Sequence, residues 1–246
     1  MSQYDLLATL SEATAEAPLR KYFEEYSFFE ALGDVRGQSI LDIGCGTGLY
    51  TRRLKQRGAA RVLGLDASAG MIEYARHLES GKPLGIEYVV KDAADAGDVG
   101  RFDVVTATYL LHYAPSREVM SGMCRSMLRA LAPGGRLVSI CLNPEINLTD
   151  PSYYHPYGFE MASRGGEGAE AMMTSVMPEM PFAIKTYAWS RATYEGALTE
   201  AGFRDIRWHA PAISPAGLEK LGSDHWRAYL RQPHAAIFDC MTEQRA

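Results

Sequence analysis

Short apolar runs alternate with helix-spaced segments along much of this chain. The runs are rich in Ile, Leu and Val and are bounded by turn-forming residues. Such runs are typical of strands buried on both faces of a parallel sheet, and the segments between them repeat apolar residues at helical spacing. The pattern therefore predicts an α/β fold. The expected strands are 39–43, 61–66, 86–93, 102–108, 136–142, 203–208 and 235–240.

Two segments depart from this alternation. Residues 1–38 read as helical, with Pro18 suited to a first helical turn and Gly33 to a helix end. Residues 143–188 break the strand–helix rhythm and are rich in Tyr, Met, Pro and Gly. A long irregular insertion is usually functional or disordered, and aromatic and thioether side chains argue against disorder. We expect an N-terminal helical lid at 1–38 and a domain at 39–246 whose insertion at 143–188 caps a ligand site. A packing layer on the sheet edge or a dimer contact is the alternative for the cap.

Composition narrows the kinds of partner. The chain of 246 residues has a net charge of −5 with interspersed acids and bases, whereas a nucleic-acid face needs clustered Lys and Arg. The four cysteines show no C-x-x-C pair and no metal-ligand spacing, which is typical of free thiols in a reducing cytoplasm. Tyr4 and Asp5 interrupt any apolar leader, and no run approaches the roughly 20 apolar residues of a membrane span. We expect a cytoplasmic monomer or homodimer without nucleic-acid, membrane or metal partners.

Three glycines at alternate positions follow the first expected strand. Gly44, Gly46 and Gly48 lie between Asp42 and a helical pattern that starts near Leu49. A strand that turns into a helix through glycine presents free backbone N–H groups and lets a ligand approach the main chain closely. A dinucleotide fingerprint would place its third glycine where Leu49 stands, so the spacing argues against that kind of site.

Two further strands end in a carboxylate. Asp66 closes the second strand and Asp92 the third, as Asp42 closes the first. Ligands of open α/β sheets bind beyond the carboxyl ends of the strands, so we expect these three side chains to face one crevice. An acidic residue at the end of the second strand can bind both hydroxyls of a ribose. A helix cap is the alternative for Asp66, and a surface turn for Asp92.

The sequence Asp-x-Gly-x-Gly-x-Gly resembles motif I of the class I S-adenosylmethionine (SAM) methyltransferases. Leu-x-Pro-Gly-Gly at 131–135 resembles a second landmark of that family, and the resemblance spans about residues 35–210. It implies a Rossmann-like sheet of seven mostly parallel strands, the last one antiparallel, with helices on both faces. It also implies SAM as cofactor and S-adenosylhomocysteine (SAH) as product. The cofactor-binding residues that it implies in the sheet domain are Asp42, Gly44, Gly46, Gly48, Asp66, Ala67, Met71, Asp92, Ala93 and Thr108.

The N-terminal segment supplies further cofactor candidates. In methyltransferases of this class, an N-terminal extension often covers the cofactor, which implies contacts from Tyr4, Arg20 and Tyr22. The alternative for each is an amphipathic residue with an apolar stem and a wet tip.

The turn after the fourth strand supplies the catalytic candidates. Thr-Tyr-Leu-Leu-His-Tyr at 108–113 resembles the turn near the transferable methyl group in small-molecule methyltransferases. The Asn/Asp-Pro-Pro-aromatic sequence that amino-modifying nucleic-acid methyltransferases carry is replaced there. Tyr109 and His112 are therefore the expected catalytic residues. A buried, hydrogen-bonded histidine is the alternative for His112.

Aromatic residues of the cap indicate the kind of acceptor. We expect Tyr153, Tyr154, Tyr157 and Trp189 to stack on a flat or apolar small molecule. The Gly-Ser-Asp-His-Trp segment near the carboxyl end resembles toxoflavin-type azapteridine N-methyltransferases of microbial secondary metabolism. The expected function is metal-independent methyl transfer to N or O of an aromatic or heterocyclic metabolite. A non-catalytic SAM-binding protein and, less well supported, an NAD(P)-dependent oxidoreductase are the alternatives.

Overall fold

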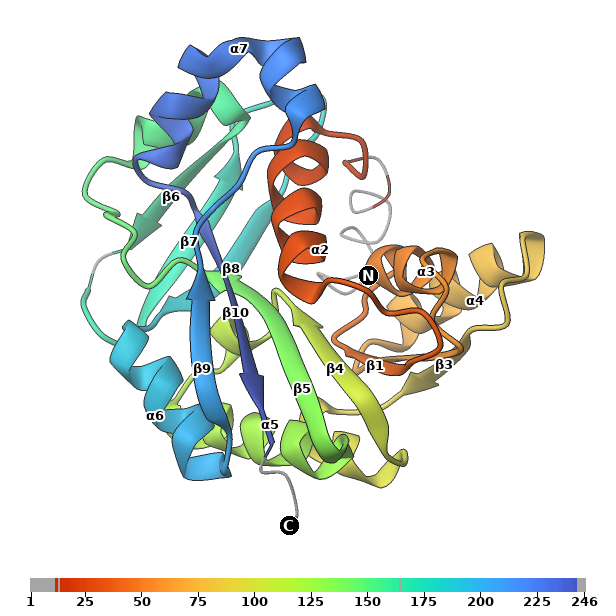
Figure 1. Cartoon of the computed structure of the whole chain (residues 1–246). Coiled ribbons are helices and arrows are strands. Elements are labelled where there is room, and N and C mark those ends of the chain that lie inside the picture. Colours follow the sequence, from red (N-terminus) through yellow and green to blue (C-terminus); the bar gives the residue numbers. More distant parts are fainter. Residues whose placement is uncertain (1–11, 13, 164, 243–246) are drawn as a thin grey trace.

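The computed structural model describes residues 12, 14–163 and 165–242, and a seven-stranded sheet forms its centre (Figure 1). The strands lie in the order β3-β2-β1-β4-β5-β10-β9. Strand β1 pairs in parallel with β2 and β4, whereas β10 runs antiparallel to β5 and β9. The predicted α/β sheet with an antiparallel last strand is confirmed. The strands are β1 (Ser39–Ile43), β2 (Arg61–Asp66), β3 (Glu87–Val90), β4 (Phe102–Thr108), β5 (Leu131–Leu142), β9 (Arg204–His209) and β10 (Ala235–Met241).

The longer helices begin where the sequence offers a capping side chain. Ser68, Ser116, Ser190 and Ser214 each accept a hydrogen bond from the backbone N–H three residues further on, which satisfies a donor that the helix leaves open. The helical elements are η1 (Arg20–Glu25), α2 (Tyr26–Leu32), α3 (Leu49–Gln56), α4 (Ala69–Gly81), η2 (Ala93–Asp98), η3 (Leu111–Tyr113), α5 (Arg117–Ala130), η4 (Pro151–Tyr157), α6 (Arg191–Ala201) and α7 (Pro215–Leu230).

The large sheet buries apolar side chains on both faces. Successive side chains of a strand point to opposite faces, so Ile40 joins one apolar cluster and Leu41 the other. The cluster around Leu41 includes Met127 of α5, and the cluster around Ile40 includes Phe23 of η1. Element η1 leads directly into α2. Because Phe23 of η1 packs in the cluster around Ile40, the helix expected before the first strand covers a face of the sheet.

The insertion at 143–188 is regular, which differs from the irregular segment that its composition predicted. Strands β6 (Phe159–Ser163), β7 (Ala169–Ser175) and β8 (Ala183–Ala188) pair into a three-stranded antiparallel sheet. Phe159 and Met161 are buried at alternate positions, which is the period of a strand with one covered face. In Figure 1, α2 stands between this small sheet and helices α3 and α4.

Candidate functional site

The glycine turn joins β1 to α3 in a backbone conformation that suits glycine. Gly44, Gly46 and Gly48 have φ angles of 71°, 55° and 80°, in the left-handed region that side chains disfavour. The N–H groups of Gly44 and Cys45 both donate to the Leu65 carbonyl, at 2.7 and 3.0 Å, which fixes the start of the turn against β2. A Cβ at Gly46 would meet no heavy atom within 4 Å, so the turn is open on that side.

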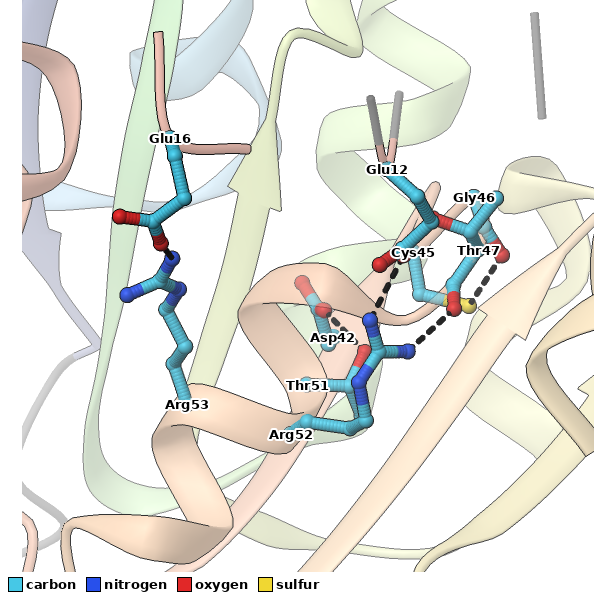
Figure 2. A network of polar contacts seen from close by, with 9 residues as sticks. All are labelled: Glu12, Glu16, Asp42, Cys45, Gly46, Thr47, Thr51, Arg52 and Arg53. Atoms are coloured by element: carbon cyan, nitrogen blue, oxygen red, sulfur yellow. Dashed lines mark hydrogen bonds and ion pairs between the residues drawn. The ribbon is translucent and has the colours of Figure 1, made fainter. Parts of the chain in front are cut away.

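Asp42 precedes this turn on β1, and its carboxylate binds the helix that follows the turn (Figure 2). The carboxylate is fully buried and accepts hydrogen bonds from the Thr51 hydroxyl at 2.7 Å and the Thr106 hydroxyl at 2.8 Å. Burial raises the pKa of Asp42 to about 6, although both hydroxyls favour the charged form. The contacts shown by the structure therefore join β1, α3 and β4, and direct contact of Asp42 with a cofactor stays a prediction.

The other two strand-end carboxylates lie in different surroundings. Asp66 accepts the Gly46 N–H at 2.9 Å and the Ser68 N–H at 2.8 Å, and burial raises its pKa. Asp92 is exposed and caps η2 by accepting the Ala94 N–H at 2.8 Å. Asp66 thus faces the glycine turn directly, whereas the expected meeting of all three carboxylates at one surface is not what the structure shows.

A cavity of about 340 Å³ begins at the glycine turn and Asp66 and extends to the small sheet. Its volume falls in the range of small-molecule sites, which is roughly 300–1,000 Å³. Nine of the residues expected to bind or react line it: Arg20, Gly44, Gly46, Asp66, Met71, Thr108, Tyr109, His112 and Tyr157. Tyr4 lies outside the described residues.

Several other expected site residues lie in packing positions. Tyr22 packs against Gly217 of α7, and the hydroxyl of Tyr153 donates to the Ala228 carbonyl. Tyr154 is fully buried with its ring stacked on Phe159 at 5.0 Å.

Further members of this set also lie outside the lining of the cavity. The Trp189 indole N–H donates to the Ala114 carbonyl at 3.0 Å, and Gly48 contacts Tyr88. Ala93 is buried, and Ala67 is exposed. Ligand contacts of these residues and of those in the preceding paragraph stay predictions.

The two catalytic candidates differ in what they can do. Tyr109 has a φ of 57°, and its hydroxyl oxygen lies 3.1 Å from His234 Nε2. Burial and the nearby charge of Glu24 raise the pKa of Tyr109 well above its ordinary value, so its hydroxyl stays a donor. His112 Nδ1 accepts the Leu142 N–H at 3.3 Å, and burial lowers the pKa of His112 to about 3. Such a weak base fits the hydrogen-bonded alternative better than proton abstraction near neutral pH.

Some residues of the cavity wall were not expected from the sequence. Glu24 and His234 are buried there, and Tyr50 places its hydroxyl in the same wall. Glu24 follows Arg20 by four residues on the same helix, a spacing that lets opposite charges pair and is a weak signal of a buried ion pair. On the side of the small sheet, the cavity wall contains a set of thioether and aromatic side chains: Phe159, Met161, Met173, Met177, Met180 and Phe182.

The N-terminal segment crosses the glycine turn. Glu12 accepts hydrogen bonds from the Thr47 hydroxyl at 2.7 Å and from Arg52 Nη2 at 2.6 Å (Figure 2). Thr14 and Ala17 line the cavity, so the segment between Glu12 and η1 forms part of its wall. The described residues contain no cluster of three or more His, Cys, Asp or Glu side chains suited to a metal ion. Within the same residues, no helix is long and apolar enough to cross a membrane.

Comparison with known proteins relates this site to methyltransferases. Residues 40–135 match the family described as "Methyltransferase domain". A ubiquinone biosynthesis O-methyltransferase of Coxiella burnetii is 33% identical over 110 residues, which are 44% of this chain and 45% of that protein. The chain thus spans about half the length of the curated relatives it matches.

Solved structures of methyltransferases share the whole architecture. A putative S-adenosylmethionine-dependent methyltransferase from Listeria monocytogenes superposes with a TM-score of 0.64 at 22% identity, covering 90% of this chain and 97% of that one. The DhpI–SAH complex gives a TM-score of 0.61 at 22% identity, covering 98% and 94%. Residues 40–135 thus match a methyltransferase domain, and the chain has the same fold as these solved methyltransferase structures.

Proposed function

We propose that this protein transfers a methyl group from SAM to nitrogen or oxygen of a small aromatic or heterocyclic acceptor. The observation that carries the proposal is the continuous cavity, which joins the glycine turn and Asp66 to a wall of thioether and aromatic side chains. One end has the groups that suit an adenosine, and the other has an apolar surface that suits a flat ring.

The residues at the first end fit SAM. The open side of Gly46 leaves room for a ligand close to the main chain, and Asp66 supplies carboxylate oxygens for ribose hydroxyls. Met71 offers a polarizable apolar face for the adenine ring, and Arg20 a cation for the methionyl carboxylate. SAM carries a methyl group on a positively charged sulfur, so the transferable group is already activated when the cofactor is bound.

The chain's own contribution is then binding, orientation and exclusion of water. Alignment of two reactants can supply roughly 7–11 kcal/mol of a barrier. Methionine side chains adapt their shape to a ligand and form favourable contacts with aromatic rings, which suits Met161, Met173 and Met177 to a planar acceptor. Transfer by in-line displacement needs no metal in this scheme. The segment before η1 and the small sheet act as lid and acceptor cap.

The acceptor class has support from two directions. The relatives are named ubiquinone biosynthesis O-methyltransferases, which favours a small molecule methylated on oxygen. The segment near the carboxyl end resembles azapteridine N-methyltransferases, which favours a ring nitrogen in secondary metabolism. We propose a cytoplasmic protein, monomeric or dimeric, that acts on such metabolites and not on nucleic acids.

Ligand-induced thermal shifts and turnover test the proposal. SAM and SAH should raise the melting temperature of the wild type, whereas NAD should not, because binding to the folded state alone stabilises it. Asp66→Ala should lose most of that shift, while Asp224→Ala, an exposed carboxylate on α7, should keep it. Methyl transfer from labelled SAM to a panel of aromatic heterocycles should exceed transfer to RNA. A shift with NAD alone would indicate an oxidoreductase, and SAM binding without any turnover a non-catalytic protein.

A further inference from the structure

A buried polar cluster lines the cavity wall beside the thioether and aromatic side chains. His234 Nε2 lies 3.4 Å from Glu24 Oε1 and 3.1 Å from the Tyr109 hydroxyl, and His234 Nδ1 lies 2.7 Å from the Tyr229 hydroxyl. Glu24 and His234 are 5% and 3% exposed, so the cluster is almost free of bulk water. It joins η1, the turn after β4, the end of α7 and the residue before β10.

The contacts assign an acceptor role to one ring nitrogen of His234 and a donor role to the other. The Tyr229 hydroxyl keeps its proton because burial raises its pKa, so it donates to Nδ1. Nε2 therefore carries a hydrogen and directs it toward Glu24 Oε1 and the Tyr109 oxygen. Burial opposes the charge of Glu24, but the bond from His234 and the charge of Arg20 outweigh it and lower the pKa of Glu24. The carboxylate is thus ionised at neutral pH.

One oxygen of this carboxylate lacks a hydrogen bond, although Glu24 lines the cavity. Glu24 Oε2 is buried and has no hydrogen-bond partner among the described residues, and Arg20 Nε lies 3.6 Å from it, beyond hydrogen-bond distance. The buried hydroxyl of Tyr50 in the same wall is also without a hydrogen-bond partner in the described part of the chain. Buried polar atoms are rarely left unpaired, since each costs roughly 1–3 kcal/mol. A ligand with a hydrogen to donate would satisfy Oε2.

A purely structural role explains the cluster less well. A contact that only joins η1 to the residue before β10 would need Oε1 and His234, but it would not need an unpaired second oxygen on a residue that lines the cavity. Buried ion pairs are also weak contributors to stability, because desolvation offsets most of the attraction. Glu24 instead lines the same cavity as Phe159 and Met161, which suits contact with a bound ring.

We propose, on the basis of the function proposed above, that Glu24 is a catalytic residue that binds the hydrogen of the acceptor's nucleophilic O–H or ring N–H group through Oε2. As the new bond from that atom to the methyl carbon forms, the sulfur–methyl bond breaks and its electron pair remains on sulfur. The proton then passes from the methylated atom to Glu24 Oε2. His234 and Tyr229 are positioning residues that hold Oε1, and the Tyr109 hydroxyl contacts the His234 ring. The acceptor is accordingly a neutral, flat molecule with a hydroxyl or ring N–H.

Two matched probes test this contact without turnover. 1-Naphthol and 1-methoxynaphthalene share a flat apolar body, but only the first has a hydrogen to donate. With SAH present, the wild type should bind 1-naphthol at least about fivefold more tightly by calorimetry, as expected for a hydrogen bond to a charged group. Glu24→Gln should lower that ratio at least about threefold and leave the affinity for SAH within about twofold. Glu25→Gln, the same change one residue along on the side that pairs with Arg53, should keep both values.

Each other result decides the matter. An unchanged probe ratio in Glu24→Gln, or a wild type that binds neither probe, would overturn the proposal. A large loss of SAH affinity in Glu24→Gln would assign the carboxylate to the cofactor instead. If the wild type does not bind SAH at all, the proposed function itself fails. Should Glu24→Gln not fold, Tyr229→Phe, which removes only the hydroxyl at His234 Nδ1, should lower the probe ratio while SAH affinity persists.

Discussion

At the scale of single residues, burial sets the chemistry of the cavity wall. His112 and Asp42 are both buried near the glycine turn, but burial acts on them in opposite directions because one is charged when protonated and the other when deprotonated. The folded chain keeps His112 neutral and makes Asp42 easier to protonate. Their effects on stability therefore oppose each other as the pH falls.

His112 should make the protein less stable in acid. Its pKa is about 3 in the folded state against an ordinary value of 6.5, so between these values the unfolded chain binds a proton that the folded chain does not. The contribution of His112 to the free energy of unfolding is fully present above pH 6.5. It is lost as the pH falls, by about 2 kcal/mol at pH 5. His112→Gln, whose side-chain carbonyl can still accept the Leu142 N–H, should remove this loss.

Urea unfolding at pH 7 and pH 5 measures the effect. Asp42 should offset part of it in the wild type, because its raised pKa stabilises the folded state by about 1 kcal/mol over the same interval. Asp42→Asn should accordingly steepen the acid loss, and this variant is the control. Equal losses of unfolding free energy between pH 7 and pH 5 in the wild type and His112→Gln would contradict the buried, neutral state of His112.

Residue roles could be predicted from sequence only where a local pattern determines them. Gly44, Gly46, Asp66, Met71 and Tyr109 line the cavity because the β-turn-α spacing places them at or just beyond the ends of adjacent strands. Glu24 and His234 could not be paired in advance, since they lie about 200 residues apart in the chain and meet only through packing of η1 on β10. The same packing buries Tyr154, which composition alone had suggested for stacking on a ligand.

At the scale of elements, the glycine turn combines two separate requirements. Gly46 and Gly48 both need a left-handed backbone, but their surroundings differ. A Cβ at Gly46 would enter open space, whereas one at Gly48 would overlap the hydroxyl and ring of Tyr88. The third glycine of the motif is therefore fixed by the contact between the turn and β3 as well as by its φ angle.

Alanine at these two positions should separate strain from overlap. Gly46→Ala should destabilise the ligand-free protein by about 1–2 kcal/mol through its φ angle alone. Gly48→Ala should cost a further 1–3 kcal/mol or so, because the Tyr88 ring must move. Chemical denaturation of both variants without ligand gives the comparison. Equal losses of unfolding free energy would mean that the Tyr88 ring moves aside without destabilising the protein.

The elements differed in how well their sequences predicted them. The strands of the large sheet follow from short apolar runs, and four serines mark the starts of α4 to α7. The small sheet was not expected, because Met and Ala are weak strand formers. Burial of Phe159 and Met161 favours the strand conformation of β6. Strand propensity depends on what covers the strand, and that is not visible in the local sequence.

At the scale of the whole molecule, Glu12 ties the N-terminal segment to the glycine-turn end of the cavity. Glu12 binds Thr47 and Arg52, which belong to the turn and to α3, and Thr14 and Ala17 follow in the wall. These contacts lie beside the glycine-turn end of the cavity, so we expect them to slow the release of a ligand bound there.

Weakening the contact of Glu12 should speed cofactor release. Glu12→Gln replaces charge-assisted bonds by neutral ones, and we expect the dissociation rate of SAH to rise about three- to tenfold, as for a loss of roughly 1 kcal/mol. Stopped-flow displacement of SAH measures the rate. Lys21→Gln, which breaks an exposed ion pair with Glu16 further along the segment, is the control and should leave the rate unchanged. An equal rate in Glu12→Gln and wild type would show that the segment does not retain the ligand.

Arg20 and Glu24 stand one turn apart on η1, and both face the cavity. The helical element η1 thus carries both the cation proposed to bind SAM and the anion proposed to bind the acceptor. If binding of one reactant orders η1, the other reactant binds to a site that is already ordered. The two should therefore bind with positive cooperativity, each raising the affinity for the other by the same factor.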